Sequence, residues 1–249
     1  MKSPVVIGAL GGSGTRVVAR IVRESGYFLG NNRNESEDAM EFVEFYDRWI
    51  NRYMLRERAP FCREEDELMQ RDFNSCMGRH RAGIPQDEAP WGWKEPRSIY
   101  LLPFFHAIFS DLKFIHVVRD GKDMAFSSNQ NQLRKHGAAL LDPSLRAAPQ
   151  PVQMAALWAK INLSVAAYAE SHLVGRYLIV QFEELCVKRR EIATELATFL
   201  DCPTLDVGAS TAKIITPPSM ERWRQVEDKS LIAAIHAQAG ETLRKFGYS

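Results

Sequence analysis

The sequence predicts an α/β fold in a single domain, residues 1–249, with helices flanking a central, mainly parallel β-sheet. Three observations predict this fold. Short, continuous apolar runs are typical of strands buried on both faces. Segments with apolar residues at helical spacing lie between those runs, and strands that alternate with helices form parallel sheets covered on both sides. The chain is also long enough to bury a substantial core.

The strands are predicted where the apolar runs are clearest. Residues 4–10 (PVVIGAL) and 112–120 (LKFIHVVRD) are the strongest, and 176–185 (RYLIVQFEEL) is a third. A short strand is also expected in WGWKEPR, residues 91–97, running into a turn at Pro96.

The helices are predicted from apolar side chains that recur every three or four residues. They are expected over about 15–25, 38–58, 64–77, 97–109, 152–171, 188–200 and 229–246, with one more opening at Gly121. Loops are expected at 31–37, 78–90 and 136–151. The last of these holds Gly137 and three prolines, which predicts a mobile loop.

Composition excludes several classes of protein. The net charge is +1, which gives no general attraction to nucleic acid or to an anionic membrane, and no run of about 20 apolar residues predicts a membrane span. The four cysteines form no C-x-x-C pair, which argues against a zinc ribbon or a disulfide framework and favours a reducing compartment. We therefore expect a cytoplasmic protein.

The motif VVIGALGGSGTRVV, residues 5–18, places four glycines in seven positions between a strand and a helix. Backbone N–H groups at a helix N-terminus suit a phosphate, and the loop Gly11, Gly12, Ser13, Gly14 would present them. Thr15 and Arg16, with Ser13, would add hydroxyl and guanidinium donors. The alternative is a tight turn that only lets strand and helix pack closely.

Two other phosphate motifs fit less well. The ATP/GTP P-loop needs Lys after its last glycine, whereas Gly14 is followed by Thr15 and Arg16. Gly8, Gly12 and Gly14 fit a variant of the dinucleotide fingerprint. However, no second strand ends in an acidic residue about 20 positions later, and the chain has no Tyr-x-x-x-Lys.

The segment FIHVVRDGKDMAFSS, residues 114–128, resembles the 3′-phosphate-binding element of sulfotransferases that use 3′-phosphoadenosine 5′-phosphosulfate. The family pattern is a buried strand, then Arg-Asp-Pro-x-Asp, then Ser eight residues after the Arg. Arg119, Asp120, Asp123 and Ser127 match it, and Gly121 replaces the proline. With Arg119 at the strand end and Ser127 about two turns into a helix, both would reach one phosphate.

Other segments extend the resemblance over most of the chain. GGSGTR resembles the family's 5′-phosphosulfate loop, and WKEPR resembles its Lys-x-Pro segment. VQFEEL resembles a strand end with Phe182 in the aromatic place, and ERWRQV resembles a C-terminal Arg-Trp-Arg whose arginines, here Arg222 and Arg224, close over the nucleotide.

The resemblance implies a P-loop-like nucleotide site and an enzyme. The enzyme would transfer a sulfuryl group from that donor to a hydroxyl or an amine of a small-molecule or saccharide acceptor, by in-line displacement and without a metal. Two alternatives stay open: a P-loop-like kinase that uses ATP, and an adenosine-nucleotide-binding module that has lost catalysis.

The catalytic residues follow from the same resemblance. Many members carry Lys or Arg at the position of Gly12, and Arg16 and Lys94 are the candidates for the missing cation. Lys94 resembles a family lysine on the acceptor side and is favoured, with Arg16 on the 5′-phosphate. Relatives of the heparan type place a glutamate base shortly after the first helix, near Asp38 or Glu41. His80 is an alternative base, and Trp91 and Trp93 either flank the acceptor or belong to the core.

Overall fold

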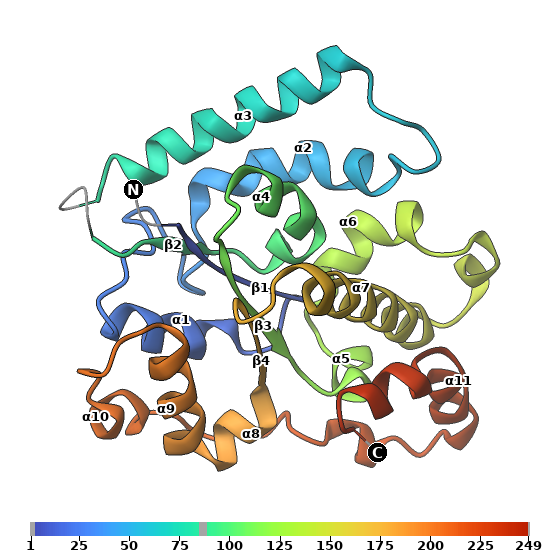
Figure 1. Cartoon of the computed structure of the whole chain (residues 1–249). Coiled ribbons are helices and arrows are strands. Elements are labelled where there is room, and N and C mark those ends of the chain that lie inside the picture. The colour runs from blue at the N-terminus through green and yellow to red at the C-terminus, as the bar shows by residue number, and fades with distance from the viewer. Residues whose placement is uncertain (1–2, 85–88, 249) are drawn as a thin grey trace.

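Four parallel strands form the central sheet of the computed structural model, which describes residues 3–84 and 89–248 (Figure 1). They are β1 (Val5–Ala9), β2 (Gly92–Lys94), β3 (Lys113–Val118) and β4 (Tyr177–Gln181), in the spatial order β2-β1-β3-β4. In the central pair, Val5 lies opposite Lys113 and Ala9 opposite Val117. The carboxyl ends of β1 and β3 therefore meet at one edge, which confirms the predicted α/β fold.

Helices cover both faces of this sheet. The longer ones are α1 (Thr15–Glu24), α2 (Val43–Met54), α3 (Arg63–Arg81), α6 (Asn131–Leu140), α7 (Gln150–His172), α9 (Arg189–Phe199) and α11 (Lys229–Lys245). The shorter ones are α4 (Leu102–Ile108), α5 (Gly121–Ala125), α8 (Phe182–Val187), α10 (Val207–Thr211) and four 3₁₀ turns, η1 (Met40–Phe42), η2 (Pro96–Leu101), η3 (Pro143–Ala147) and η4 (Arg222–Gln225).

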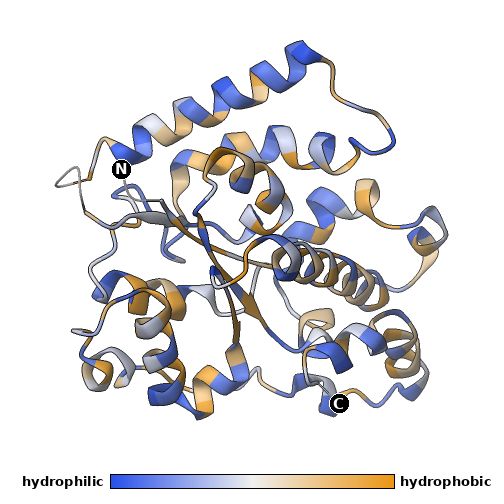
Figure 2. Ribbon diagram, viewed as in Figure 1, coloured by the Kyte–Doolittle hydropathy of each residue, from blue (hydrophilic) through white to orange (hydrophobic). Residues whose placement is uncertain are grey.

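The alternation of side chains along the strands divides the core in two. Val5 and Ile7 of β1 face α1 and α9, together with Ile115 of β3. Val6 and Phe114 face the larger cluster, which α2, α3, α4, α6, α7 and α11 build on the other side. Figure 2 shows apolar residues over much of the central strands, with polar ones among them, and alternating hydrophilic and apolar residues along outer helices such as α3. Among the described residues, no helix is long and apolar enough to cross a membrane.

The predicted mobile loop at 136–151 is wrong for most of its length. Helix α6 continues to Leu140, and η3 and the start of α7 occupy the prolines. Pro143 and Pro151 lie in the first turns of their helices, where a missing N–H breaks no hydrogen bond, so they mark helix starts. Helix α3 also runs to Arg81, which shortens the loop predicted at 78–90. Residues 85–88 of that loop lie outside the described residues.

The strand predicted at 176–185 is shorter than expected. It ends at Gln181, and helix α8 begins directly at Phe182. Because β4 lies at the edge of the sheet, only Val180 of its residues is fully buried. The apolar run therefore spans two elements, and the change of direction brings Phe182 back toward the glycine loop.

Candidate active site

The glycine loop connects β1 to α1 at the carboxyl edge of the sheet. Gly12 and Gly14 have φ angles of 98° and 83°, a backbone region that residues with side chains rarely adopt. Gly14 is the N-cap residue of α1 and brings no side chain to the free N–H groups of the first turn. The loop thus presents bare backbone donors at the positive end of a helix dipole.

Phe182 closes one side of the loop. A Cβ atom added to Gly14 would lie 2.1 Å from the Phe182 ring, so only glycine fits there. The guanidinium of Arg119 lies over the other part of this ring, 5.3 Å from its centroid. The start of α8 therefore packs against the glycine loop and against the end of β3, which places a buried aromatic ring between the two predicted phosphate contacts.

Arg119 and Arg222 converge on a single oxygen atom. Arg119 Nη2 donates to the carbonyl of Ser219 at 2.7 Å, and Arg222 Nε donates to the same carbonyl at 3.0 Å. Arg119 Nη1 also donates to the Gly12 carbonyl at 3.3 Å. Burial lowers the pKa of Arg222, and the nearby positive charge of Arg119 adds to that effect. The Asp123 carboxylate, 3.5 Å from Arg119 Nη2, balances part of this charge, and the second guanidinium group still favours a further anion beside them.

The backbone around Arg119 is held by residues from distant elements. The Trp158 indole of α7 donates to the Arg119 carbonyl at 3.0 Å, and the same ring lies where a Cβ of Gly121 would be, at 2.6 Å. This packing explains why glycine stands where the family has proline. Arg119 itself is 6% exposed, and its Nε is buried without a hydrogen-bond partner among the described residues. An unsatisfied buried donor suits a ligand that accepts a hydrogen bond.

The sequence predicted Ser127 on a helix, but in the structure it lies in a turn beyond the end of α5. Helix α5 ends at Ala125. In the turn that follows, the Gln130 side-chain amide donates a hydrogen bond to the Ser127 carbonyl at 2.7 Å. The Ser127 hydroxyl still lies beside the glycine loop, 3.4 Å from the position of a Cβ on Gly12. Arg119, Ser127 and the loop therefore meet around Gly12.

Lys94 and Asp38 form an ion pair near the same edge of the sheet. Lys94 is 1% exposed at the end of β2, and its ammonium donates to the Asp38 carboxylate and to the Ser36 carbonyl. Burial lowers the pKa of Lys94, an effect that Asp38 opposes. Asp38 lines a cavity of about 300 Å³ together with Gly11 of the glycine loop. The ion pair therefore adjoins the predicted nucleotide site.

Glu41 lies away from that cavity. Its carboxylate faces His80 in the core, with Oε2 3.5 Å from His80 Nδ1. His80 is 1% exposed and its Nε2 is 2.8 Å from the Gly92 carbonyl, and burial lowers its pKa. Of the candidate bases, Asp38 is the one that adjoins the glycine loop. Trp91 and Trp93 are buried in the core.

The remaining predicted site residues differ in how far they are exposed to solvent. Ser13 and Thr15 are buried, Arg16 is exposed on α1, and Arg224 is exposed and pairs with Glu221. Sequence reasoning missed Ser219, although its place just before the ERWRQV motif was a signal. Among the described residues, no group of three or more His, Cys, Asp and Glu side chains is placed to hold a metal ion.

Comparison with known proteins identifies this arrangement. A model of the sulfotransferase family matches residues 4–206, which include the glycine loop, Lys94 and the strand end at Arg119. The chain belongs to the sulfotransferase family. This sulfotransferase has no significant match among curated protein sequences. The predicted family and enzyme class are confirmed, which leaves the kinase and dehydrogenase interpretations without support.

Solved structures share the fold of this sulfotransferase at low sequence identity. The sulfotransferase domain from the curacin biosynthetic pathway matches with a TM-score of 0.60 and 14% identity, over 100% of this chain and 99% of that one. The sulfotransferase domain of the olefin synthase from Synechococcus PCC 7002 has a TM-score of 0.56 and 16% identity, and the sulfotransferase from Alicyclobacillus acidocaldarius has 0.53 and 14%. Both cover 100% of this chain, which itself spans 97% of each.

Proposed function

We propose that this sulfotransferase transfers a sulfuryl group from 3′-phosphoadenosine 5′-phosphosulfate to a hydroxyl, or an amine, of a polar small molecule or saccharide. The observation that carries the proposal is the convergence of Arg119 and Arg222 on one oxygen beside the glycine loop. Two guanidinium groups at this distance suit a dianionic phosphate better than a neutral carbonyl. We assign them to the 3′-phosphate.

The glycine loop suits the 5′ end of the donor. Its backbone N–H groups and the N-terminus of α1 favour negative charge, and Ser13 and Thr15 add hydroxyl groups at the same place. The buried Nε of Arg119 and the glycine-only contact between Gly14 and Phe182 support a site built for close approach of an anion. We assign Arg16 and Arg224, which are exposed, to contacts with the nucleotide from the solvent side.

The acceptor is assigned to the cavity that Gly11 and Asp38 share. Its lining includes the amides of Asn129, Asn131 and Gln132 and the charged groups of Glu95 and Arg97. Amide and carboxylate groups bind hydroxyl groups in directed hydrogen bonds, whereas an apolar acceptor would leave them unsatisfied. A polar, hydroxyl-bearing acceptor therefore fits this lining.

In the proposed reaction, Asp38 accepts the proton of the acceptor hydroxyl as its oxygen attacks sulfur. The new O–S bond forms as the bond between sulfur and the bridging phosphate oxygen breaks, and the electron pair leaves with the nucleotide bisphosphate. Lys94 holds Asp38 in position and supplies positive charge beside the glycine loop, where Gly12 brings none. The backbone donors of the loop stabilise the departing phosphate.

Calorimetry with 3′-phosphoadenosine 5′-phosphate and AMP tests the donor assignment. We expect the bisphosphate to bind far more tightly than AMP. The Arg119→Ala variant should lose about 2–5 kcal/mol of binding free energy for the bisphosphate, because a buried anion is left unpaired. Arg63→Ala, which removes an 88% exposed guanidinium on α3, should change nothing. Equal affinity for the two nucleotides would refute the assignment.

We place the enzyme in the cytoplasm. The support is the exposed, unpaired thiol of Cys62, which suits a reducing compartment better than an oxidising one. A redox-sensitive alkylation assay on intact cells would test it, with a fully reduced Cys62 as the expected result.

A further inference from the structure

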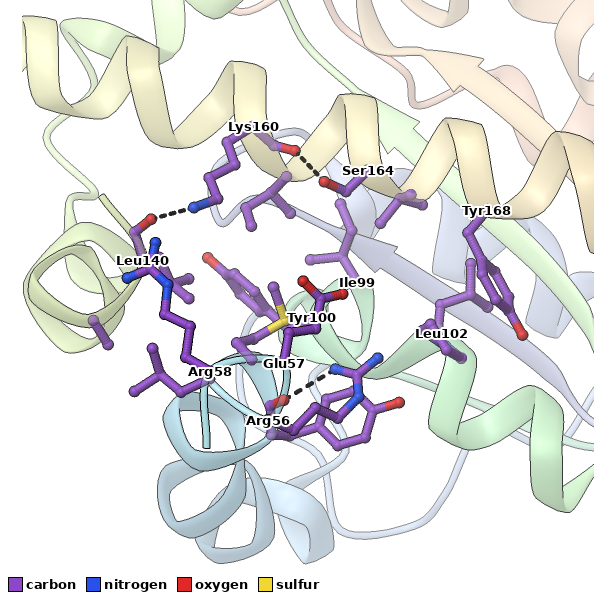
Figure 3. A pocket seen from close by; sticks show the side chains of 17 residues that line it. Arg56, Glu57, Arg58, Ile99, Tyr100, Leu102, Leu140, Lys160, Ser164 and Tyr168 are labelled. Carbon is purple, nitrogen blue, oxygen red and sulfur yellow. Dashed lines mark hydrogen bonds between the residues drawn. The ribbon is translucent and has the colours of Figure 1, made fainter. Parts of the chain in front are cut away.

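A second cavity adjoins the end of α6, whereas Gln132 near the start of that helix lies beside the glycine loop. It has a volume of about 320 Å³ and is formed by the end of α2, by η2 and α4, by the end of α6, and by the middle of α7 (Figure 3). None of the residues predicted for the nucleotide or for catalysis lines it. Its walls differ strongly in character from those of the cavity assigned to the acceptor.

The inner walls of this cavity are apolar. Ile99, Leu102, Ile161 and Val165 are buried, and Met54 adds a flexible apolar side chain. In Figure 3, Leu102 and Tyr168 lie at one end of the cavity. Most small-molecule sites combine such apolar walls with a few placed polar groups. The walls therefore suit an alkyl chain or another apolar body.

The opposite end of the cavity is positively charged. Figure 3 shows that Lys160 and Arg58 extend there toward Leu140, and Lys160 donates to the Leu140 carbonyl, the last of α6. Arg56 lies between the two ends and stacks on the Tyr53 ring, 3.8 Å from its centroid. Two cations thus lie at this mouth of the cavity and a third lies beside the cavity, whose lining holds one carboxylate, Glu57.

One more carboxylate acts on these cations. Asp142, just beyond α6, interacts electrostatically with Arg58 and Lys160, but its carboxylate also accepts the Ser144 N–H at 2.8 Å as the cap of η3. With Glu57 and Asp142 counted, the mouth keeps an excess of positive charge. An anionic head group would balance that excess.

A hydrogen-bonded partition separates this cavity from the acceptor cavity. The Tyr100 hydroxyl donates to Gln132 Oε1 at 2.9 Å, and the His136 ring packs on Tyr100 at 5.1 Å between centroids. Tyr100 lines the second cavity, whereas Gln132 lines the acceptor cavity. The two are therefore distinct binding spaces that share one wall.

We propose that the second cavity binds an amphipathic carboxylate, of the class of a medium-chain fatty acid. Its alkyl chain lies against Ile99, Leu102 and Val165 and points toward Tyr168, and its carboxylate lies between Arg58 and Lys160. The proposal concerns binding alone and does not depend on the donor, the acceptor or the turnover of the enzyme.

The test is calorimetry of the whole chain with decanoate, with decylammonium and decan-1-ol as ligands of matched chain length. We expect decanoate to bind about tenfold or more tightly than either, a ratio that one favourable charge contact supplies. The double variant Arg58→Gln/Lys160→Gln should weaken decanoate binding about tenfold and leave decanol binding unchanged. Arg71→Gln, an exposed substitution on α3, is the matched charge control and should have no effect.

Two further measurements fix the location. Ser164→Trp, at an exposed position on the rim of the cavity, should abolish binding of all three ligands by filling it. The methyl resonance of Met54 in methyl-labelled protein, assigned with Met54→Leu, should shift on addition of decanoate. Equal affinity for the three ligands would overturn the charge argument. No binding of decanoate at millimolar concentration, or binding that neither moves Met54 nor responds to Ser164→Trp, would overturn the site.

Discussion

Two features of the structure require glycine at position 14: a positive φ angle and close contact with Phe182. Substitutions can test these two features separately. Its φ of 83° is unfavourable for any side chain, and a Cβ would collide with Phe182. We predict that Gly14→Ala lowers the free energy of unfolding by about 1–3 kcal/mol. It should also weaken nucleotide binding by about tenfold or more, because it displaces the loop that holds the phosphate. Urea unfolding and calorimetry measure the two effects.

Gly26 provides the matched control. Its φ is 86°, yet nothing lies within 4 Å of a Cβ built on it. Gly26→Ala therefore carries the backbone strain alone and should lower stability while nucleotide affinity stays the same. If Gly14→Ala also bound nucleotide normally, the glycine loop would be a turn and no phosphate site.

The single residue Lys94 allows a prediction about the turnover rate. Its ammonium holds Asp38, and both groups act mainly in the transition state of the proposed reaction. We predict that Lys94→Ala lowers kcat by roughly 10²–10³, the usual effect of losing one preorganised donor. The Kd for 3′-phosphoadenosine 5′-phosphate should change little, since this residue lies outside the loop. The measurement needs an acceptor, which a mass-spectrometric screen for sulfated products would supply.

Arg16→Ala is the comparison that decides between the two cations. The guanidinium of Arg16 is exposed on α1 and belongs to the nucleotide side, so its loss should raise the Kd for nucleotide more than it lowers kcat. If Lys94→Ala turned over normally and Arg16→Ala did not turn over at all, the catalytic cation would be Arg16.

For the helices and strands, the sequence predicted those elements whose positions depend on local residue patterns. The two central strands, β1 and β3, and the helix after Gly14 follow from continuous apolar runs and from the glycines that interrupt them. Helix α5 begins at Gly121 as predicted but ends at Ala125, and α8 was predicted as strand, because short helices depend on tertiary contacts such as the packing of Trp158 on Gly121. The same limit applies to the site: motifs predicted Arg119 and Ser127, whereas the contact with Ser219 joins residues 100 positions apart.

The segment around η4 is the element that closes over the proposed 3′-phosphate site. Asp123 accepts the backbone N–H groups of Glu221 at 2.8 Å and Trp223 at 3.3 Å, which fixes the segment on α5. A nucleotide that binds only the closed arrangement stabilises it by mass action. We predict that 3′-phosphoadenosine 5′-phosphate at 100 times its Kd slows hydrogen exchange of these two amides by up to about a hundredfold.

Mass spectrometry of peptides over 217–226 measures this exchange. A peptide from α3, on the opposite side of the molecule, provides the internal control and should exchange at the same rate with and without nucleotide (Figure 1). Unchanged exchange over 217–226 would mean that η4 does not close over the nucleotide.

For the whole molecule, the residues that support the site are also those that join the layers. Helix α7 supplies Trp158 to the Arg119 backbone and Asn162 to His116 in the middle of β3. Tyr248, near the C-terminus, donates to Glu183 at 2.8 Å, and Glu183 accepts the Asp120 N–H at 3.0 Å. The sheet edge that holds the candidate site therefore depends on packing across the full thickness of the fold.

The buried His116 makes the stability of this packing depend on pH, which can be measured. The side chain is fully buried, with Nδ1 2.8 Å from the Tyr177 hydroxyl and Nε2 2.8 Å from Asn162 Oδ1. Both contacts suit a neutral ring that accepts from Tyr177 and donates to Asn162. Burial lowers the pKa of His116 to about 4, whereas the unfolded chain has the ordinary value of about 6.5. Between these values the unfolded state binds the extra proton, so stability falls as the pH falls.

We predict that His116 alone costs the fold about 2 kcal/mol between pH 7 and pH 5, the amount that follows from the two pKa values. The comparison of the wild type with His116→Gln isolates this contribution, because the glutamine amide can both donate and accept hydrogen bonds but does not titrate in this range. Urea unfolding at the two pH values should show a drop in stability that is about 2 kcal/mol smaller in the variant. His236→Gln, at an exposed position on α11, should keep the wild-type drop. An equal drop in His116→Gln and wild type would show that His116 takes up its proton equally well in the folded and unfolded states, so that burial does not lower its pKa.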